Sequence, residues 1–209
     1  PLETRVEDLL GRMTLEEKVS QTLYTAPAIE RLGIPEYNWW NECLHGVARS
    51  GKATLFPQAI GMAATFDREV MYRMADVTST EARAKHHDFM ARGKRGIYQG
   101  LTFWSPNINI FRDPRWGRGH ETYGEDPYLS GSMAAAYVQG LQSEKVAACI
   151  KHFVCNDQEF ERFSISYEVA ERPLHEIYLQ PFRIALQQAS PWSLMSAYNR
   201  INGTHASEN

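Results

Sequence analysis

Apolar residues recur along the chain at two spacings, which together predict helices alternating with strands. After Asp67, a good helix N-cap, apolar side chains follow three to four positions apart and predict a long helix that turns Val70, Met74 and Val77 inward. The charged run Glu81–Asp88 is expected to be its solvated face. Glycines from Gly93 onward end it.

Three further segments carry helical signals. Thr14 and Glu17 form a capping-box pattern before an amphipathic helix with Leu15, Val19 and Leu23 at helical spacing. Asp126 followed by proline predicts a helix start, with apolar residues at Leu129, Met133, Tyr137 and Leu141. A helix over residues 173–188 is expected to kink at Pro181.

Short apolar runs between these helices predict strands. They lie at residues 100–106, 145–150 and 192–198. Alternation of strands with helices favours a parallel sheet with right-handed crossovers. Each run ends in a polar or charged segment, and residues 107–126 form a long loop. Because β/α barrels keep their active sites at the carboxyl ends of the strands, the functional residues are expected there. No repeat or linker composition appears, so no internal boundary is predicted in residues 1–209.

Composition narrows the choice of function. The 209 residues are 43% hydrophobic and carry a formal net charge of −3, typical of a globular protein without a domain-wide basic field for nucleic acid or an anionic membrane. No uncharged apolar stretch approaches a bilayer-spanning length, and export would need a removed leader. The cysteines Cys43, Cys149 and Cys155 form no CxxC pair, so free thiols are expected.

Polar side chains gather at the predicted strand ends. A pocket for a neutral polyol needs such a mixture of donors and acceptors, because each hydroxyl group both donates and accepts. Aromatic rings in the same segments would suit the apolar faces of sugar rings, although burial in the core is the commoner role for any one of them. The polar set is Glu42, His45, Arg112, Asp113, Arg115, Arg118, Glu121, Lys151, His152, Tyr198 and Asn199, and the aromatic set is Trp39, Trp40, Trp104 and Trp116.

Other chemistries have weaker signals. His86 and His87 precede Asp88, and His120 precedes Glu121, but neither cluster has the HExxH spacing of a zinc site. No GxSxG elbow for a nucleophilic serine is present. The basic residues around Arg115 could form an anion-binding patch, yet the acidic residues beside them indicate internal ion pairs.

Four stretches of the chain, in order, resemble family 3 glycoside hydrolases, the retaining exo-acting β-glucosidases and β-xylosidases. They are WNECLHGVARSGKATLFPQAIGMAATFD, NINIFRDPRWGRGHETYGEDPYL, KHFVCNDQE and SLMSAYNRING. The resemblance implies an α/β fold of the TIM-barrel (β/α) type, here incomplete, with the last strands and a second α/β sandwich domain outside residues 1–209. It also implies a substrate that is a β-linked oligosaccharide or aryl glycoside, with no cofactor and no metal.

The resemblance also carries roles for individual residues. By position in the family's motifs, the terminal sugar would be held by Glu42, Arg118, Lys151, His152, Met195 and Tyr198. Glu42 is similar to the xylosidase branch, since glucosidases usually place Asp there and the extra methylene would crowd a hydroxymethyl group. From about Lys145 onward the sequence resembles the glucosidase branch, in which Arg162 would also approach the site. Natural divergence or a joining of two parent sequences would each give this mixture.

The family's nucleophile and acid/base are a further point of difference. A retaining glycosidase needs two carboxyl groups about 5 to 5.5 Å apart. In the family, the nucleophile lies in an SDW-like motif beyond the asparagine-glycine turn and the acid/base lies in the second domain, so no catalytic residue is nominated before Asn209. The chain would then need a C-terminal part of the same enzyme or an equivalent chain. The alternative function is a non-catalytic carbohydrate-binding or scaffold chain that needs a complementing partner.

The incomplete barrel and the family resemblance each lead to one further expectation. An open barrel would expose strand edges and apolar faces that favour self-association. The resemblance favours a secreted or periplasmic location over a cytoplasmic one.

Overall fold

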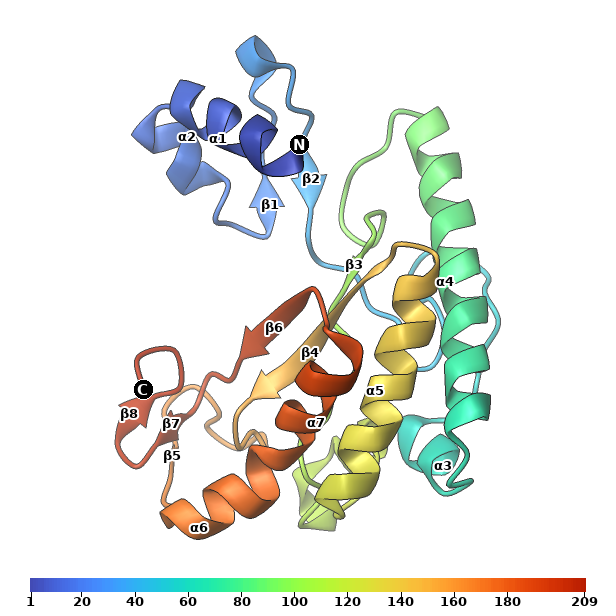
Figure 1. Cartoon of the computed structure of the whole chain (residues 1–209), viewed down its shortest axis with the longest axis vertical. Helices are drawn as coiled ribbons and strands as arrows, with labels where there is room; N and C mark the ends of the chain where they lie inside the picture. Colours follow the sequence, from blue (N-terminus) through green and yellow to red (C-terminus); the bar gives the residue numbers. More distant parts are fainter.

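A parallel three-stranded sheet lies at the centre of the computed structural model, which describes residues 1–209. Its strands are β3 (Thr102–Phe103), β4 (Ala147–Phe153) and β6 (Ser193–Ser196), in the order β3-β4-β6. Helix α5 (Pro127–Ser143) connects β3 to β4, and α7 (Gln180–Ala189) precedes β6. The predicted alternation of strands and helices in a parallel sheet is confirmed (Figure 1).

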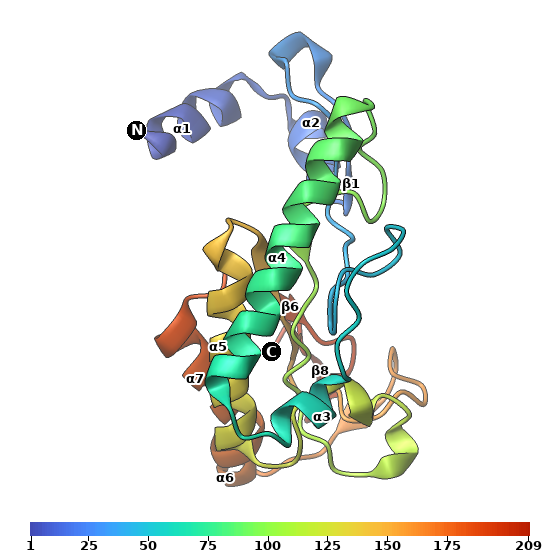
Figure 2. The same ribbon diagram turned by 90° about the vertical axis from the view of Figure 1, so that its right-hand side faces the viewer.

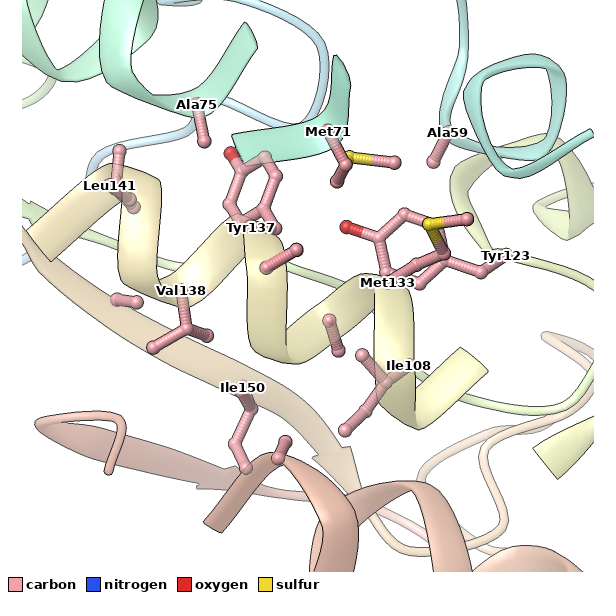
Figure 3. Packing of buried hydrophobic residues seen from close by; sticks show 14 of the residues in the cluster. Ala59, Met71, Ala75, Ile108, Tyr123, Met133, Tyr137, Val138, Leu141 and Ile150 are labelled. Carbon is pink, nitrogen blue, oxygen red and sulfur yellow. The ribbon is translucent and has the colours of Figure 1, made fainter. Parts of the chain in front are cut away.

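Helix α5 is the centre of the core. It packs between α7 and α4 (Arg68–Ala91), and it also contacts β4. The buried ring of Tyr137 lies between α5 and the α4 residues Met71 and Ala75, whereas Val138 turns toward Ile150 of β4 (Figure 3). A Cβ on Gly140 would lie 2.3 Å from the Tyr72 carbonyl oxygen, so glycine is required where α4 and α5 cross.

The predicted helix starts are confirmed by their capping bonds. Asp67 Oδ1 accepts hydrogen bonds from the backbone N–H groups of Glu69 and Val70 at 2.9 and 3.1 Å. Asp126 Oδ1 accepts one from Leu129 at 2.5 Å. These bonds satisfy backbone donors that have no partner within the helix.

The inward face of α4 differs from the prediction. Met74 is buried, but Val77 is 42% exposed, and the buried side is completed instead by Met71, Ala75, Thr78, Ser79 and Ala82. The charged run is not a free solvated face either. Glu81 accepts from Thr54, Arg83 donates to the Lys145 carbonyl at 2.7 Å, and Lys85 donates to the Ser50 carbonyl at 2.9 Å. Loops that pack on α4 from elsewhere in the chain therefore decide which face is covered.

The predicted helix over residues 173–188 is interrupted. It consists of α6 (Glu171–Pro173), a π-helical turn η4 (Leu174–Tyr178) and α7. Leu179 N–H donates to the Leu174 carbonyl at 2.8 Å, five residues back. Pro181 has no N–H group, and its ring crowds the carbonyl four residues earlier. The predicted interruption of the helix at Pro181 therefore occurs as a π-helical turn just before it.

The N-terminal segment extends away from the sheet. It contains α1 (Leu2–Arg12), which the sequence pattern did not predict, α2 (Leu15–Ser20), and an antiparallel pair of β1 (Thr25–Ala26) with β2 (Tyr37–Asn38) (Figure 2). The capping box is confirmed, with Glu17 N–H donating to Thr14 Oγ1 at 3.2 Å. The helix ends at Ser20, short of Leu23. Its apolar side chains Leu15 and Val19 are exposed, as are Leu2, Val6 and Leu10 of α1.

Short elements complete the chain. They are η1 (Glu30–Leu32), α3 (Ala59–Ala63), η2 (Pro114–Trp116), η3 (Gly119–Glu121), β5 (Ser166–Tyr167), β7 (Arg200–Ile201) and β8 (Thr204–His205). The turn expected after Tyr198 joins β7 to β8 through Asn202 and Gly203, both at positive φ. All three cysteines are free thiols, as predicted, and none of the helices combines the length and apolarity needed to cross a membrane.

Candidate functional site

A pocket of about 330 Å³ brings together three of the seven predicted sugar-binding residues. Glu42, Arg118 and Lys151 line it, and Glu121 lies beside them. Lys151 Nζ donates to both carboxylate oxygens of Glu42, at 3.1 and 3.2 Å, and its side chain is only 4% exposed. An ammonium group this deeply buried is retained only where a partner is positioned for it.

Backbone and side-chain bonds fix the loop that carries Glu42. Asn41 Nδ2 donates to the Thr102 carbonyl at 2.9 Å, and Asn41 Oδ1 accepts from Gly100 N–H at 2.8 Å. The buried amide thus ties the loop after β2 to the start of β3. Lys151 comes from the carboxyl half of β4, the central strand, so the ion pair joins two parts of the chain 109 residues apart.

The long loop between β3 and α5 supplies Arg118. The 3₁₀ turn η3 places Glu121 so that it accepts from Arg118 Nε at 2.8 Å and from Nη2 at 2.6 Å. This two-point pairing fixes the plane of the guanidinium group. The internal ion pairs expected in this loop are present here, and also at the exposed pair of Asp113 with Arg115.

Glu159 is the residue that sequence reasoning missed. It accepts from Arg118 Nη1 at 3.2 Å and from Arg162 Nη1 at 2.6 Å, and Asn156 Nδ2 donates to it at 3.1 Å. Arg162 is therefore connected to the pocket through Glu159 rather than by lining it. The three-residue spacing of Glu159 and Arg162 was the available signal.

His152 is buried beside the pocket and held by Asn109. Asn109 Nδ2 donates to the His152 carbonyl at 2.8 Å, which orients the amide so that Oδ1 faces the His152 backbone N–H and Nδ1, both at 2.9 Å. Nδ1 therefore carries the proton and Nε2 is an acceptor. Burial, reinforced by the positive charges of Lys151, Arg118 and Arg162, holds the pKa of His152 well below its ordinary value.

Met195 and Tyr198 come from β6 and the segment that follows it. Met195, in β6, is half-buried, and Tyr198 is exposed. The Tyr198 ring packs on Phe163 with centroids 4.7 Å apart, and the Arg162 guanidinium lies over both rings at 5.0 and 5.4 Å. Neither Met195 nor Tyr198 is among the residues that line the pocket around Lys151.

The pKa values of the two carboxylates that line the pocket are shifted in opposite directions. Burial raises the pKa of Glu42 above its ordinary value, against the opposing effect of Lys151. Burial also acts to raise the pKa of Glu121, but the Arg118 guanidinium outweighs it and leaves the pKa lowered. The arrangement offers fixed acceptors and charged donors to a neutral ligand that has several hydroxyl groups.

Comparison with known proteins places the chain. Residues 7–209 match the family model of the glycosyl hydrolase family 3 N terminal domain. The chain belongs to glycosyl hydrolase family 3. It is 42% identical to a probable beta-D-xylosidase 7 of Arabidopsis thaliana over 97% of this chain and 29% of the relative, and 42% identical to a xylan 1,4-beta-xylosidase of Xylanibacter ruminicola over 95% of this chain and 24% of the relative.

Solved structures of family 3 enzymes share the fold. A GH3 exo-beta-xylosidase in complex with a xylobiose aziridine activity-based probe superimposes with a TM-score of 0.87 at 34% identity, over 97% of this chain and 28% of that one. A beta-glucosidase from Kluyveromyces marxianus in complex with glucose gives 0.84 at 38% identity, over 97% and 24%. The mixed α/β fold is thus that of the family's TIM-barrel-type domain. The chain spans less than a third of the length of these relatives.

The other polar residues predicted for the site of this family 3 domain do not all lie in the pocket. His45 lines the pocket and its Nδ1 bonds the Phe56 carbonyl at 2.9 Å, whereas Arg112 donates to Tyr178 at 2.8 Å outside it, and Asn199 is buried. Of the tryptophans, Trp40 lines the pocket and packs on Trp104 with centroids 4.7 Å apart. Trp116 is buried in the core, and Trp39 is exposed.

The histidines that the sequence offered as metal ligands are not joined by further ligands in the structure. His86 Nδ1 lies 2.7 Å from the Gln99 carbonyl oxygen, and its ring is 6.2 Å from that of His87. No group of three or more His, Cys, Asp or Glu side chains has the arrangement of a metal site.

Proposed function

We propose that this family 3 domain is the sugar-recognising part of an exo-acting retaining glycosidase that releases terminal, non-reducing β-D-xylose, with β-D-glucose as the alternative sugar. The observation that carries the proposal is the pocket in which Glu42, Lys151 and Arg118 converge at the carboxyl end of β4. The xylosidase names of the curated relatives and the probe-bound xylosidase structure support the sugar class.

Recognition would use hydroxyl groups as both donors and acceptors. Glu42 would accept from two neighbouring hydroxyls while Lys151 Nζ donates to one of them. Charge-assisted bonds of this kind are stronger and shorter than neutral ones. His152, neutral with Nε2 free to accept, suits a hydroxyl donor and not an anionic ligand.

The two catalytic carboxyl groups are proposed to come from outside these residues. Every carboxylate around the pocket is already engaged with a cation: Glu42 with Lys151, Glu121 with Arg118, and Glu159 with both arginines. A retaining glycosidase needs two carboxyl groups about 5 to 5.5 Å apart, one as nucleophile and one as acid/base. No cofactor enters the proposed reaction.

Turnover of aryl β-xyloside and aryl β-glucoside tests the proposal, with the chain alone and with a C-terminal complement from a family relative. Release of the aryl group only with the complement is expected. Turnover by the chain alone would contradict the proposed absence of the nucleophile. Saturable sugar binding without turnover in the complemented protein would favour the non-catalytic carbohydrate-binding alternative.

Glu42→Asp tests the choice of xylose. Removing one methylene opens the space that a hydroxymethyl group needs, so the kcat/KM ratio of glucoside to xyloside should rise by about tenfold or more. Glu7→Asp, a conservative change at an exposed carboxylate of α1 that does not line this pocket, is the matched control. An unchanged ratio in Glu42→Asp would remove Glu42 as the residue that selects the sugar.

A further inference from the structure

A second hollow lies between the N-terminal ends of α4 and α5. Its volume is about 420 Å³, and it shares no lining residue with the pocket around Lys151. Both helices begin at the same end of the molecule, close to α3 (Figure 1). The lining residues are Phe66, Arg68, Glu125, Asp126, Tyr128, Leu129, Ser132 and Met133.

Two aromatic side chains at this hollow are exposed. Phe66 is 75% exposed and Tyr128 is 68% exposed, and the half-buried Leu129 also lines the hollow. Large aromatic side chains are normally among the more buried residues, and exposed apolar patches often mark binding sites. Flat rings such as these suit the C–H faces of pyranose rings.

Three polar side chains of the hollow, Ser132, Glu125 and Arg68, form few or no bonds within the chain, whereas Asp126 caps α5. Ser132 is 6% exposed and lines the hollow, yet its hydroxyl forms no hydrogen bond within the chain. The Glu125 carboxylate has no ion-pair partner, and the one side-chain contact of Arg68, to Gln188 Oε1, is at the 3.5 Å limit. The Ser132 hydroxyl oxygen keeps contact with solvent, so a ligand hydroxyl can take the place of water there.

The hollow continues past Glu125. A neighbouring hollow of about 430 Å³ shares Glu125 and is lined on its far side by Ile60, Phe111, Arg112, Pro114 and Gly124. The two together have room for more than one sugar ring, and they are lined by both arginine and carboxylate groups, so neither charge sign dominates. A neutral, elongated ligand fits this better than an anion or a cation.

We infer that this double hollow, the α4–α5 groove, binds a neutral linear β-linked oligosaccharide outside the pocket around Lys151. The choice of ligand rests on the proposed function, since the groove would hold the polymer whose end enters that pocket. Phe66 and Tyr128 stack on sugar rings, and Glu125, Arg68 and Ser132 bond their hydroxyls.

Calorimetric titration of the protein with xylohexaose and with methyl β-D-xyloside tests the groove. The double variant Phe66→Ala/Tyr128→Ala should weaken xylohexaose binding by about tenfold or more and leave methyl β-D-xyloside binding unchanged. Trp192→Ala is the matched control, because Trp192 is an exposed aromatic residue just before β6 that lines neither hollow. Thermal unfolding followed by circular dichroism checks that each variant folds, and Glu125→Gln, at an exposed position, is the second variant should the aromatic pair unfold.

The outcomes separate the groove from the proposed function. Unchanged xylohexaose affinity in both groove variants, or no xylohexaose binding by the unaltered protein, overturns the groove. Xylohexaose binding that Lys151→Met abolishes also overturns it, because the oligosaccharide would then bind at one site only. Groove-dependent xylohexaose binding without any methyl β-D-xyloside binding supports the groove and contradicts the proposed function.

Discussion

The two ends of the buried interior are built from different residues. Around α5 the interior is apolar, and Tyr137 and Met133 of α5 belong to the same buried cluster as Ile150 of β4 (Figure 3). At the carboxyl end of β4 it contains an ammonium group, an imidazole and amide side chains. Two consecutive residues of β4 mark the boundary: Ile150 lies in the apolar interior and Lys151 in the polar one.

The difference shows that burial serves two purposes in this domain. Apolar burial at α5 stabilises the fold through removal of surface from water. Polar burial at the end of β4 costs desolvation free energy and is tolerated because partners such as Glu42 and Asn109 are fixed in place. Substitutions at the first end should therefore change stability, and substitutions at the second should change recognition or pH dependence.

The largest expected effect is at Tyr137. Tyr137→Ala should lower the free energy of unfolding by about 3 to 5 kcal/mol, because it leaves a cavity and removes the bond of 2.6 Å from the hydroxyl to the Cys43 carbonyl. Urea unfolding measures the change. Tyr128→Ala, an exposed tyrosine of the same helix, is the control and should cost less than about 1 kcal/mol. Similar losses of unfolding free energy in the two variants would mean that the buried face of α5 is not the centre of the core.

Asp157 gives the next largest effect, as a dependence of stability on pH. It is 7% exposed with an unpartnered Oδ1, and burial raises its pKa to about 7, against the opposing effects of the Ile110 backbone and Arg112. An acid whose pKa is raised on folding binds more protons folded than unfolded, so its contribution is present below about pH 4 and is lost as the pH rises toward 7.

Asp157→Asn should remove that loss, on the order of 2 to 4 kcal/mol between pH 4 and pH 8. The measurement is the difference in unfolding free energy between the unaltered chain and the variant at each pH, which cancels the titration of other groups. A difference independent of pH would show that folding does not raise the pKa of Asp157.

Lys151 gives a smaller effect, on recognition. Lys151→Met keeps the aliphatic stem and removes the charge, so it should lower kcat/KM on aryl β-xyloside in the complemented enzyme by about 10- to 150-fold, the equivalent of about 1.5 to 3 kcal/mol. Lys94→Met, at an exposed lysine, is the control and should leave kcat/KM unchanged. Equal catalytic efficiencies in the two variants would rule out Lys151 as a sugar-binding residue.

Much of the secondary structure follows from local signals. The caps at Asp67 and Asp126 form where the sequence predicted them, because a capping bond involves neighbours within three residues. The strand at β4 was predictable from its apolar run. The segment Leu2–Arg12 was missed although it is helical, and Val77 was assigned to the wrong face, since periodicity indicates a face but not what covers it.

The site was predictable only in part. The family motifs named Glu42, Arg118 and Lys151, which meet in one pocket. They also named Met195, Tyr198 and Arg162, which do not line it, and Arg162 is connected to it through Glu159. The roles of Glu159 and Asn109 depend on where their partners lie after folding. No local sequence pattern indicates a partner that lies far away in the chain. Asn109 and its partner His152, for example, are 43 residues apart.

The sequence by itself determined the alternation of helices and strands, the helix starts, and the family through its ordered motifs, because these depend on residues that are close together in the chain. Tertiary structure alone decided which charges are paired and which apolar faces are covered. Glu42 and Lys151 are 109 residues apart and meet only because a loop bound to β3 lies beside the end of β4. The apolar residues of α1 and α2 have helical spacing as well, but neither helix has a buried residue, and most of their apolar side chains stay exposed.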